Sequence, residues 1–336
     1  MKQVKSTNAS VFIPHLGCPN KCSFCDKNAV SERGKSVTAA QVGDILEAHA
    51  VSLKRRGATA QIAFFGGTFT ALEEGYRASL LETANDYIKK YPRVFTGIRC
   101  STRPDCVDAA VLRQLREYGV TAIELGAQSM DDGVLAANGR GHTADDVRES
   151  AGLVRRFGFE LGLQMMTGLY ADTLQKSLRT ADELIKLKPR TARIYPVVII
   201  RGTRLAEMGY KTFGFDETVG LCAEIYGRFV ENGVRVIRVG LNYGGDKGDI
   251  VGGNYSPVMG ELCAGRYYFN KMKDFMEKSG GAKFRIYADK RDFSKLIGHK
   301  GENKRRLLEL GYTYKIKEKQ GGEPEIRALP QRRDLV

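Results

Sequence analysis

The sequence predicts an α/β protein in which a parallel β/α barrel, full or partial, is followed by a small α+β domain. Two observations support the barrel. From about residue 11 to residue 245, short apolar runs alternate with amphipathic stretches of ten residues or more, a pattern typical of strands and helices in turn. Several amphipathic stretches also stop at a glycine, as helices commonly do. After residue 240 the chain becomes glycine-rich and polar, which indicates a boundary.

The apolar runs and the amphipathic stretches follow one another in regular order. The expected strands are Val11–Pro14, Gln61–Phe65, Gly97–Ser101, Ala122–Leu125, Glu160–Met165, Arg193–Ile199 and Val234–Val239. The expected helices are Ala40–Arg56, Glu73–Lys89, Val107–Tyr118, Ala144–Phe157, Leu174–Leu187 and Glu217–Asn232. Repeated βα units of this kind favour a parallel sheet, and their number favours a TIM-like barrel over a doubly wound sheet.

The chain is expected to divide into four segments. Residues 1–245 form the barrel, and residues 246–280 form a linker and one helix from Gly260 to Lys278. Residues 281–322 form the small domain, and residues 323–336 form a tail. A chain of 336 residues is long enough for one large and one small unit.

Composition excludes several classes of protein. With 42% hydrophobic and 27% charged residues, the chain resembles an ordinary globular protein. Its apolar runs are far too short to cross a bilayer, and its first residues lack the apolar region of a signal peptide. We therefore expect no membrane partner and a cytoplasmic location. Seven cysteines, an odd number in a chain of this size, do not suggest a disulfide framework.

Three of the cysteines, Cys18, Cys22 and Cys25, lie in the run Cys-Pro-Asn-Lys-Cys-Ser-Phe-Cys. Thiolates this close in sequence can converge on one soft metal centre. A structural zinc site takes four protein ligands, whereas three protein ligands leave one position open. A four-iron cluster held by three cysteines would keep one iron free for a small molecule. A zinc knuckle, or cysteines that only pack, is the alternative at this point.

The cysteine run resembles the cluster loop of the radical S-adenosylmethionine (SAM) enzymes. In that family the amino and carboxylate groups of SAM chelate the fourth iron, so the resemblance implies a [4Fe–4S] cluster on Cys18, Cys22 and Cys25. It also implies that Phe24 lies beside the adenine. The implied reaction is reductive cleavage of SAM to methionine and a 5′-deoxyadenosyl radical, which abstracts hydrogen from an unreactive carbon. The electron would come from a donor such as flavodoxin or ferredoxin.

A glycine pair follows the second expected strand, in the run Phe-Phe-Gly-Gly-Thr that contains Gly66, Gly67 and Thr68. A parallel barrel carries its reactive groups at the carboxyl ends of its strands, and glycine lets a ligand approach the backbone closely. In radical SAM enzymes a glycine pair here contacts the methionine amino group of SAM. The resemblance therefore assigns Gly66, Gly67 and Thr68 to the cofactor site.

Later segments resemble the subgroup that contains oxygen-independent coproporphyrinogen oxidase and the catalytic subunit of the Elongator complex. By that resemblance, Gln128, Arg140 and Gln164 surround SAM. Two positions depart from the oxidase. Gln164 replaces an aspartate that binds the ribose, although an amide still forms hydrogen bonds with a hydroxyl, and Ser101 stands near the place of an acidic residue. The Thr-Arg-Pro-Asp run that ends at Asp105 is closer to the Elongator type.

The end of the chain is basic. The net charge is +14, and from Arg266 onward there are 19 Lys and Arg residues against 10 Asp and Glu residues. Such a concentration of positive charge is typical of a protein with a polyanionic partner, most often a nucleic acid.

The same region has the element order of a KH domain: strand 283–288, helix 291–296, a Gly-x-x-Gly loop, a helix to 310 and strand 312–319. A KH loop binds the backbone of single-stranded nucleic acid. The resemblance assigns RNA contacts to Gly298, His299, Lys300, Gly301 and Lys304. A small cap that only covers the barrel is the alternative.

These patterns together predict a radical SAM enzyme that modifies RNA, either tRNA or ribosomal RNA. Two alternatives stay open: a radical SAM enzyme acting on a small molecule, as coproporphyrinogen oxidase does, and a non-enzymatic RNA-binding protein that contains zinc. The Elongator subunit spaces its cysteines more widely and carries an acetyltransferase domain for which the residues after this barrel leave no room. The sequence therefore leaves open whether this chain carboxymethylates a wobble uridine. The sequence leaves the oligomeric state open.

Overall fold

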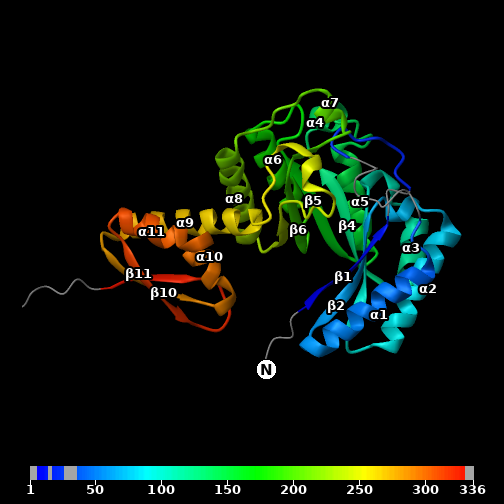
Figure 1. The fold of residues 1–336 in the computed structure, drawn as a ribbon, viewed down its shortest axis with the longest axis horizontal. Coiled ribbons are helices and arrows are strands. Elements are labelled where there is room, and N and C mark those ends of the chain that lie inside the picture. Colours follow the sequence, from blue (N-terminus) through cyan, green and yellow to red (C-terminus); the bar gives the residue numbers. More distant parts are fainter. Residues whose placement is uncertain (1–5, 14–16, 26–35, 330–336) are drawn as a thin grey trace, which may run out of the picture.

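A parallel seven-stranded sheet forms the centre of the protein, in a computed structural model that describes residues 6–13, 17–25 and 36–329 (Figure 1). The strand order is β1-β2-β3-β4-β5-β6-β8. Among the described residues the edge strands β1 and β8 do not pair with each other, so the barrel is partial. The fold class predicted from the sequence is confirmed. The strands are β1 (Ser6–Ile13), β2 (Thr59–Gly66), β3 (Phe95–Thr102), β4 (Val120–Gln128), β5 (Glu160–Thr167), β6 (Thr191–Pro196) and β8 (Arg235–Val239).

Helices cover the outer face of this sheet (Figure 1). All six expected helices are present, with ends that agree to within two residues. Their starts follow from local chemistry, since the side chains of Thr38, Thr143 and Thr173 accept hydrogen bonds from the first turns that follow them. The helices are α1 (Ala39–Arg56), α2 (Glu74–Lys90), α3 (Ala109–Glu117), α4 (Asp132–Ala137), α5 (Ala144–Arg156), α6 (Leu174–Lys186), α7 (Arg204–Glu207) and α8 (Phe215–Glu231).

The first strand is longer than the sequence predicts, starting at Ser6 and not at Val11. Ala9 and Val11 are fully buried, whereas the alternate residues Asn8 and Ser10 line a cavity on the inner face of the sheet. Alternate residues of a strand point to opposite faces, so polar residues interrupt the buried apolar ones along the sequence. The start of the strand therefore does not read as a continuous apolar run. Pro14 lies outside the described residues.

The expected strand Arg193–Ile199 is two strands, which corrects the prediction. β6 ends at Pro196, and β7 (Val198–Ile200) leaves the main sheet to pair antiparallel with β9 (Ile250–Gly253). β9 lies in the stretch expected to be a loop. A Cβ at Gly253 would lie 2.5 Å from the Val197 oxygen, so the glycine that suggests a loop is what allows the two strands to approach.

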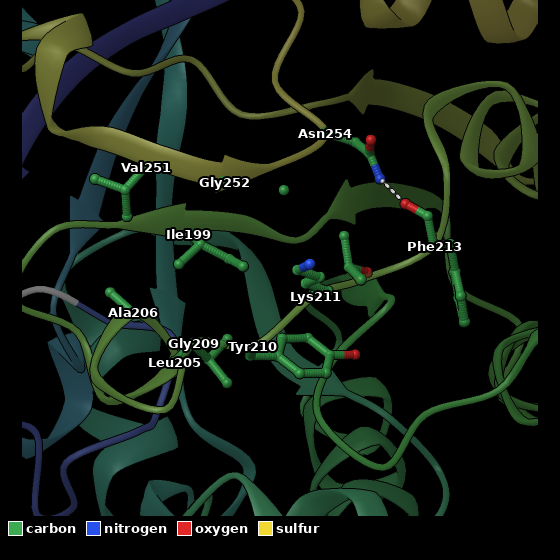
Figure 2. A pocket seen from close by; sticks show the side chains of 12 residues that line it. Ile199, Leu205, Ala206, Gly209, Tyr210, Lys211, Phe213, Val251, Gly252 and Asn254 are labelled. Atoms are coloured by element: carbon green, nitrogen blue, oxygen red, sulfur yellow. Dashed lines mark hydrogen bonds between the residues drawn. The ribbon is translucent and has the colours of Figure 1, made fainter.

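The β7–β9 ribbon covers a small cavity of about 400 Å³ (Figure 2). Its walls include Ile199 and Val251 of the ribbon, together with Leu205 and Tyr210 from the segment that begins at α7. The hydroxyl of Tyr210 donates to the carbonyl oxygen of Leu169, which closes one side. None of the residues that the sequence assigns to a site lies here.

The C-terminal unit is joined to the barrel by the long helix α9 (Met259–Ser279) (Figure 1). It contains β10 (Lys283–Ala288), α10 (Phe293–Ile297), α11 (Glu302–Glu309), β11 (Thr313–Glu318) and β12 (Glu325–Ala328). β10 pairs parallel with β11 and antiparallel with β12. The expected order of strand, helix, Gly-x-x-Gly, helix and strand is present. β12 extends the unit into residues that the sequence assigned to a tail.

The first half of α9 packs against the barrel. Met259 lies on Gly240 at the end of β8, where an added Cβ would be 2.7 Å from the Met259 Cβ. Two turns later, the rings of Tyr267 and Tyr226 of α8 meet with centroids 5.6 Å apart. The helix therefore starts at the edge of the sheet and holds the C-terminal unit on the β6–β8 side (Figure 1). No helix in the described part of the chain is long and apolar enough to cross a bilayer.

Candidate active site

A cavity of about 900 Å³ lies inside the half barrel. All three residues predicted to bind the cluster, and all eight predicted to contact SAM, line it. They come from the cysteine loop and from the ends of four strands or the loops after them. These residues are Cys18, Cys22, Phe24, Cys25, Gly66, Gly67, Thr68, Ser101, Gln128, Arg140 and Gln164.

The cysteine loop is held from the β2 side and from the β4 side. The Cys18 Sγ lies 3.1 Å from the Thr68 Oγ1, and the Arg140 Nη1 donates to the Cys22 Sγ over 3.4 Å. The Cys25 backbone N–H donates to the Cys22 carbonyl oxygen, which curls the loop into a turn. Within the described residues no three His, Cys, Asp or Glu side chains converge at the spacing of a single-ion site. An iron–sulfur cube does not need such convergence, because each cysteine binds a different iron.

Gly66 has a structural role as well as its predicted one. Its φ is +120°, and a Cβ there would lie 2.2 Å from the Ile13 carbonyl oxygen of the neighbouring strand. Only glycine fits this conformation and this approach. The turn after β2 therefore lies directly against the strand that leads into the cysteine loop.

The segment from Asn138 to Thr143 packs against the cysteine loop and forms hydrogen bonds with it. The sequence did not indicate this role. The Ser23 backbone N–H donates to the Asn138 carbonyl oxygen over 2.9 Å, and the Ser23 hydroxyl donates to the Asn138 side chain over 2.7 Å. A Cβ at Gly141 would lie 2.0 Å from the Asn20 Nδ2. Asn20 stands between Cys18 and Cys22, so this segment sets where the cysteines lie.

We predict that Gly141→Ala lowers the iron bound after anaerobic reconstitution by several-fold, because the new methyl group displaces Asn20 and with it the cysteine loop. Adding Asn20→Ala removes the clashing amide, so the double variant should recover most of the iron. Gly202→Ala is the control, since Gly202 also has positive φ but has open space around it. A double variant as deficient in iron as Gly141→Ala would contradict this view of the contact.

Two buried arginines stand beside Cys22 with N–H groups that have no partner among the described residues. These groups are the Arg103 Nη1 and the Arg140 Nε. The other nitrogens of the two guanidiniums are satisfied, for example by Asp105 and by the Gly126 carbonyl oxygen. An unsatisfied buried donor is costly. The arrangement of three thiols and two unpaired cationic donors fits an anionic cluster with a carboxylate-bearing ligand.

His142, within the segment from Asn138 to Thr143, is neutral near pH 7. Its burial and the nearby Arg140 guanidinium lower the pKa of the imidazole to about 4. The imidazole Nε2 lies 3.1 Å from the Ala127 carbonyl oxygen. The positive charge at this side of the cavity therefore comes from the two arginines and not from the histidine.

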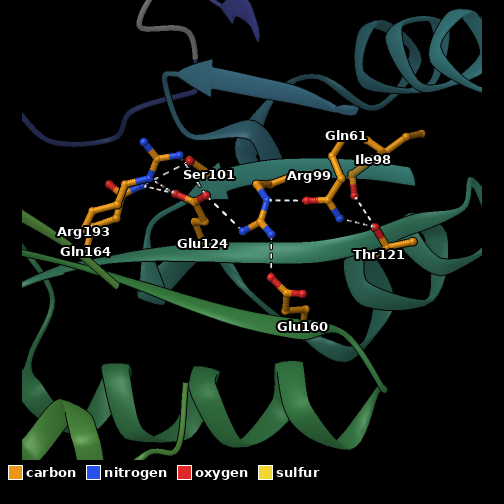
Figure 3. Close-up of polar contacts among 9 residues, drawn as sticks. All are labelled: Gln61, Ile98, Arg99, Ser101, Thr121, Glu124, Glu160, Gln164 and Arg193. Atoms are coloured by element: carbon orange, nitrogen blue, oxygen red, sulfur yellow. Dashed lines mark hydrogen bonds and ion pairs between the residues drawn. The ribbon is translucent and has the colours of Figure 1, made fainter. Parts of the chain in front are cut away.

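A second polar network lies deeper on the inner face of the sheet (Figure 3). The Glu124 carboxylate, 1% exposed, accepts from the Arg99 Nη1 over 3.1 Å and from the Arg193 Nε over 2.7 Å. Arg99 reaches Glu160 through its Nη2 over 2.5 Å. The sequence analysis missed this network. A single charged residue within each of three apolar strand patterns is the signal that could have revealed it.

The network also orients two predicted cofactor residues. The Gln164 Nε2 donates to the Glu124 Oε2 over 2.8 Å and to the Ser101 Oγ over 3.3 Å (Figure 3). The Gln164 amide is thereby held with its nitrogen toward the carboxylate. Gln128 is the last residue of β4. Its φ is +65°, and a positive φ is uncommon for a residue other than glycine.

The remaining four cysteines are not in the cavity lining. Cys100, Cys222 and Cys263 are fully buried, and Cys106 is partly buried. Burial raises the pKa of the Cys100 thiol to about 12, so it stays protonated. All seven cysteines are thiols and none forms a disulfide.

The residues predicted to bind RNA lie outside the cavity, in the C-terminal unit. Gly298 is buried, and a Cβ there would lie 2.7 Å from Asn303, whereas Gly301 has open space around it. Lys300 and Lys304 are exposed. The His299 Nδ1 lies 2.9 Å from the Glu261 carboxylate of α9. The loop therefore presents Lys300 and Gly301 to solvent, beside Lys304 of α11, and its first glycine to the protein.

Comparison with known proteins identifies relatives of this chain. It is 26% identical over 268 residues to "tRNA uridine(34) acetyltransferase" of Dehalococcoides mccartyi (strain CBDB1), covering 69% of this chain and 58% of the relative. It is 32% identical over 196 residues to human "Elongator complex protein 3", covering 52% of this chain and 36% of the relative. The chain thus spans between about a third and three fifths of the length of these relatives.

The archaeal Methanocaldococcus infernus Elp3 has a similar fold, with a TM-score of 0.63 and 20% identity over 83% of this chain and 64% of that chain. Methylornithine synthase has a TM-score of 0.51 and 14% identity, covering 93% of this chain and 84% of the other.

Family models cover most of the barrel and the start of α9. Residues 12–184 match the radical SAM superfamily, and residues 189–268 match the radical SAM C-terminal domain. The first match covers half of the chain and includes the cysteine loop, the Gly66 turn and Arg140. The chain therefore belongs to the radical SAM superfamily, whose enzymes use a [4Fe–4S] cluster and SAM.

Proposed function

We propose that this protein is a radical SAM enzyme that modifies RNA, with tRNA the leading substrate. The observation that carries the proposal is spatial. One cavity collects the three thiols and every predicted SAM contact, and a basic loop lies beside the helix that starts at the cavity's edge strand. The names of the relatives, tRNA uridine(34) acetyltransferase among them, support an RNA substrate.

The thiols of Cys18, Cys22 and Cys25 would hold the cluster. When bound, the cluster supplies an electron to the sulfonium of SAM. Arg140 donates to the Cys22 sulfur and has a buried N–H group without a partner in the described part of the chain, so we assign it to neutralise the cluster and the SAM carboxylate. Thr68, at hydrogen-bond distance from the Cys18 sulfur, would fix that thiolate.

Polar side chains on the strand ends would orient the nucleoside part of SAM. Gln164 is fixed by Glu124 and Ser101, which accept hydrogen bonds from its amide nitrogen. Its amide oxygen has no partner among the described residues and would accept a hydrogen bond from a ribose hydroxyl. Gln128 and Phe24 line the same space. Phe24 would lie against the adenine ring.

Reduction of the cluster needs an external electron donor, for which we propose flavodoxin or ferredoxin. Seven free thiols and an iron–sulfur cluster suit the reducing conditions of the cytoplasm, where we place the protein.

RNA crosslinking to the anaerobically reconstituted protein tests the substrate class. We predict that Gly301→Asp lowers the recovery of crosslinked cellular RNA by about tenfold, because it adds a carboxylate where the loop would meet phosphate. Gly298, the first glycine of the loop, is unsuitable for the test. Any side chain there would clash with Asn303 and disturb the fold.

Gly311→Asp is the matched control. Gly311 belongs to the same unit, has a φ of +85° against +77° for Gly301, and has open space around it. It should recover RNA to within about twofold of the wild type. Equal recovery from Gly301→Asp and wild type would exclude the loop as the RNA contact. If the wild type itself recovered no RNA, a small-molecule substrate would take the place of RNA.

A further inference from the structure

The edge strand β8 contains a bulge that places two arginines on the inner face of the sheet. Arg235 pairs with Thr191 of β6, and Arg238 pairs with Arg193. The two partners on β6 are two residues apart, whereas the two arginines on β8 are three residues apart, so β8 has one extra residue here. Thr191 and Arg193 lie on the inner face, since Arg193 reaches Glu124 there and alternate residues share a face. The extra residue of a bulge re-aims the side chains that follow it. Arg235 and Arg238 therefore both face the interior.

These two arginines differ from the others inside the barrel. Arg99 and Arg193 share the Glu124 carboxylate. Arg235 and Arg238 line the same cavity yet have no hydrogen-bonded or ion-paired side-chain partner among the described residues. The inner face thus carries a surplus of positive charge, and the surplus lies on the open edge of the half barrel.

The basic loop of the C-terminal unit is close to this edge along α9. The helix begins at Met259, against Gly240 at the end of β8. The loop contacts the next two turns, through His299 on Glu261 and through Gly298 on Gly265. With a rise of 1.5 Å per residue, the six residues from Met259 to Gly265 span about 9 Å. Arg238 stands two residues before Gly240, so the loop and the end of β8 are connected through the first two turns of α9.

We propose that a single strand of RNA crosses the open edge of the barrel, with backbone phosphates bound by Arg235 and Arg238 and the adjoining nucleotides held at Lys300 and Lys304. This inference rests on the proposed function and adds where the substrate enters. A nucleotide between the two contacts would turn its base into the cavity. A single strand fits because a base inside a duplex must first leave the stack to reach an enclosed site.

The test is the salt dependence of RNA binding. Each phosphate contact on a single strand contributes about 0.7 to the slope of log K against log salt concentration. The double variant Arg235→Ala, Arg238→Ala should therefore lower the magnitude of the slope by about 1.4 with a short tRNA-derived oligonucleotide. The lysine variant, Arg235→Lys with Arg238→Lys, should keep most of the slope, because it keeps the charges.

The control removes the same charge elsewhere. Arg113 of α3 and Arg179 of α6 are exposed on the outer helices, and like the edge pair they have no ion-pair partner among the described residues. Arg113→Ala with Arg179→Ala should leave the slope within about 0.3 of the wild type. An unchanged slope in the edge variant, or an equal loss in the control, would overturn the proposed entry path. Salt-independent or absent binding by the wild type would instead overturn the RNA substrate itself.

Discussion

Cys22→Ala is expected to abolish reductive cleavage of SAM. Cys22 is the most buried of the three cysteines, at 8% exposed, and it receives the Arg140 hydrogen bond. Its loss removes one of three cluster ligands and leaves the Arg140 guanidinium buried without an anion. We expect deoxyadenosine formation to fall by more than about a hundredfold, beyond the tenfold to hundredfold loss typical of an outer contact. Iron per chain after anaerobic reconstitution should fall with it.

Cys106→Ala serves as the control for this experiment. Cys106 is only partly buried, lies outside the cavity lining and contacts Asp105 weakly, with its sulfur 3.9 Å away. Iron content and deoxyadenosine formation should match those of the wild type. A Cys22→Ala protein that still formed deoxyadenosine would sink the assignment of the cluster to this loop.

Glu124→Gln is expected to be the most destabilising single substitution in the barrel interior. The Glu124 carboxylate balances Arg99 and Arg193 at full burial. A neutral amide leaves Arg193 without a counter-charge and leaves Arg99 with only the partly exposed Glu160. Removing one partner of a buried ion pair costs about 3–5 kcal/mol of the free energy of unfolding. For a chain of this size we expect Tm to fall by about 10 °C, measured by thermal unfolding of wild type and variant side by side.

Glu160→Gln provides the comparison, because Glu160 also pairs with Arg99 but its side chain is 32% exposed. Water compensates for most of the lost pairing there, so the expected cost is about 1 kcal/mol. If both variants melted at the same temperature, Glu124 would not be the centre of the network.

The cofactor side of the site was predictable because each part is encoded locally. The spacing of Cys18, Cys22 and Cys25 is visible within eight residues, and the Gly66 turn directly follows an apolar strand. Arg140 required the family resemblance. The structure places all of these in one cavity, although their individual contacts with SAM stay predictions.

The inner network was not predictable from local pattern. Glu124, Arg99 and Arg193 come from three strands and are neighbours only because of the lateral order of the sheet. Likewise, the bulge that turns Arg235 and Arg238 to the same face depends on the pairing with β6. Alternation along β8 alone would put these two arginines on opposite faces.

The β7–β9 ribbon and β12 show a different limit. Glycine-rich composition favours a loop, yet in β9 it permits the close approach to Val197. β12 is only four residues long and is stabilised by its pairing with β10, which no property of its own sequence indicates.

The contacts along the first half of α9 have a consequence for how a substrate would be chosen. Its start is fixed on Gly240, its middle on Tyr226, and the first glycine of the basic loop rests on Gly265. The first half of the helix is then a spacer of constant length between the basic loop and the edge of the cavity. For an RNA bound as proposed, the modified nucleotide would be selected by its distance along the backbone from the bound phosphates. Neighbouring bases could then vary without loss of modification.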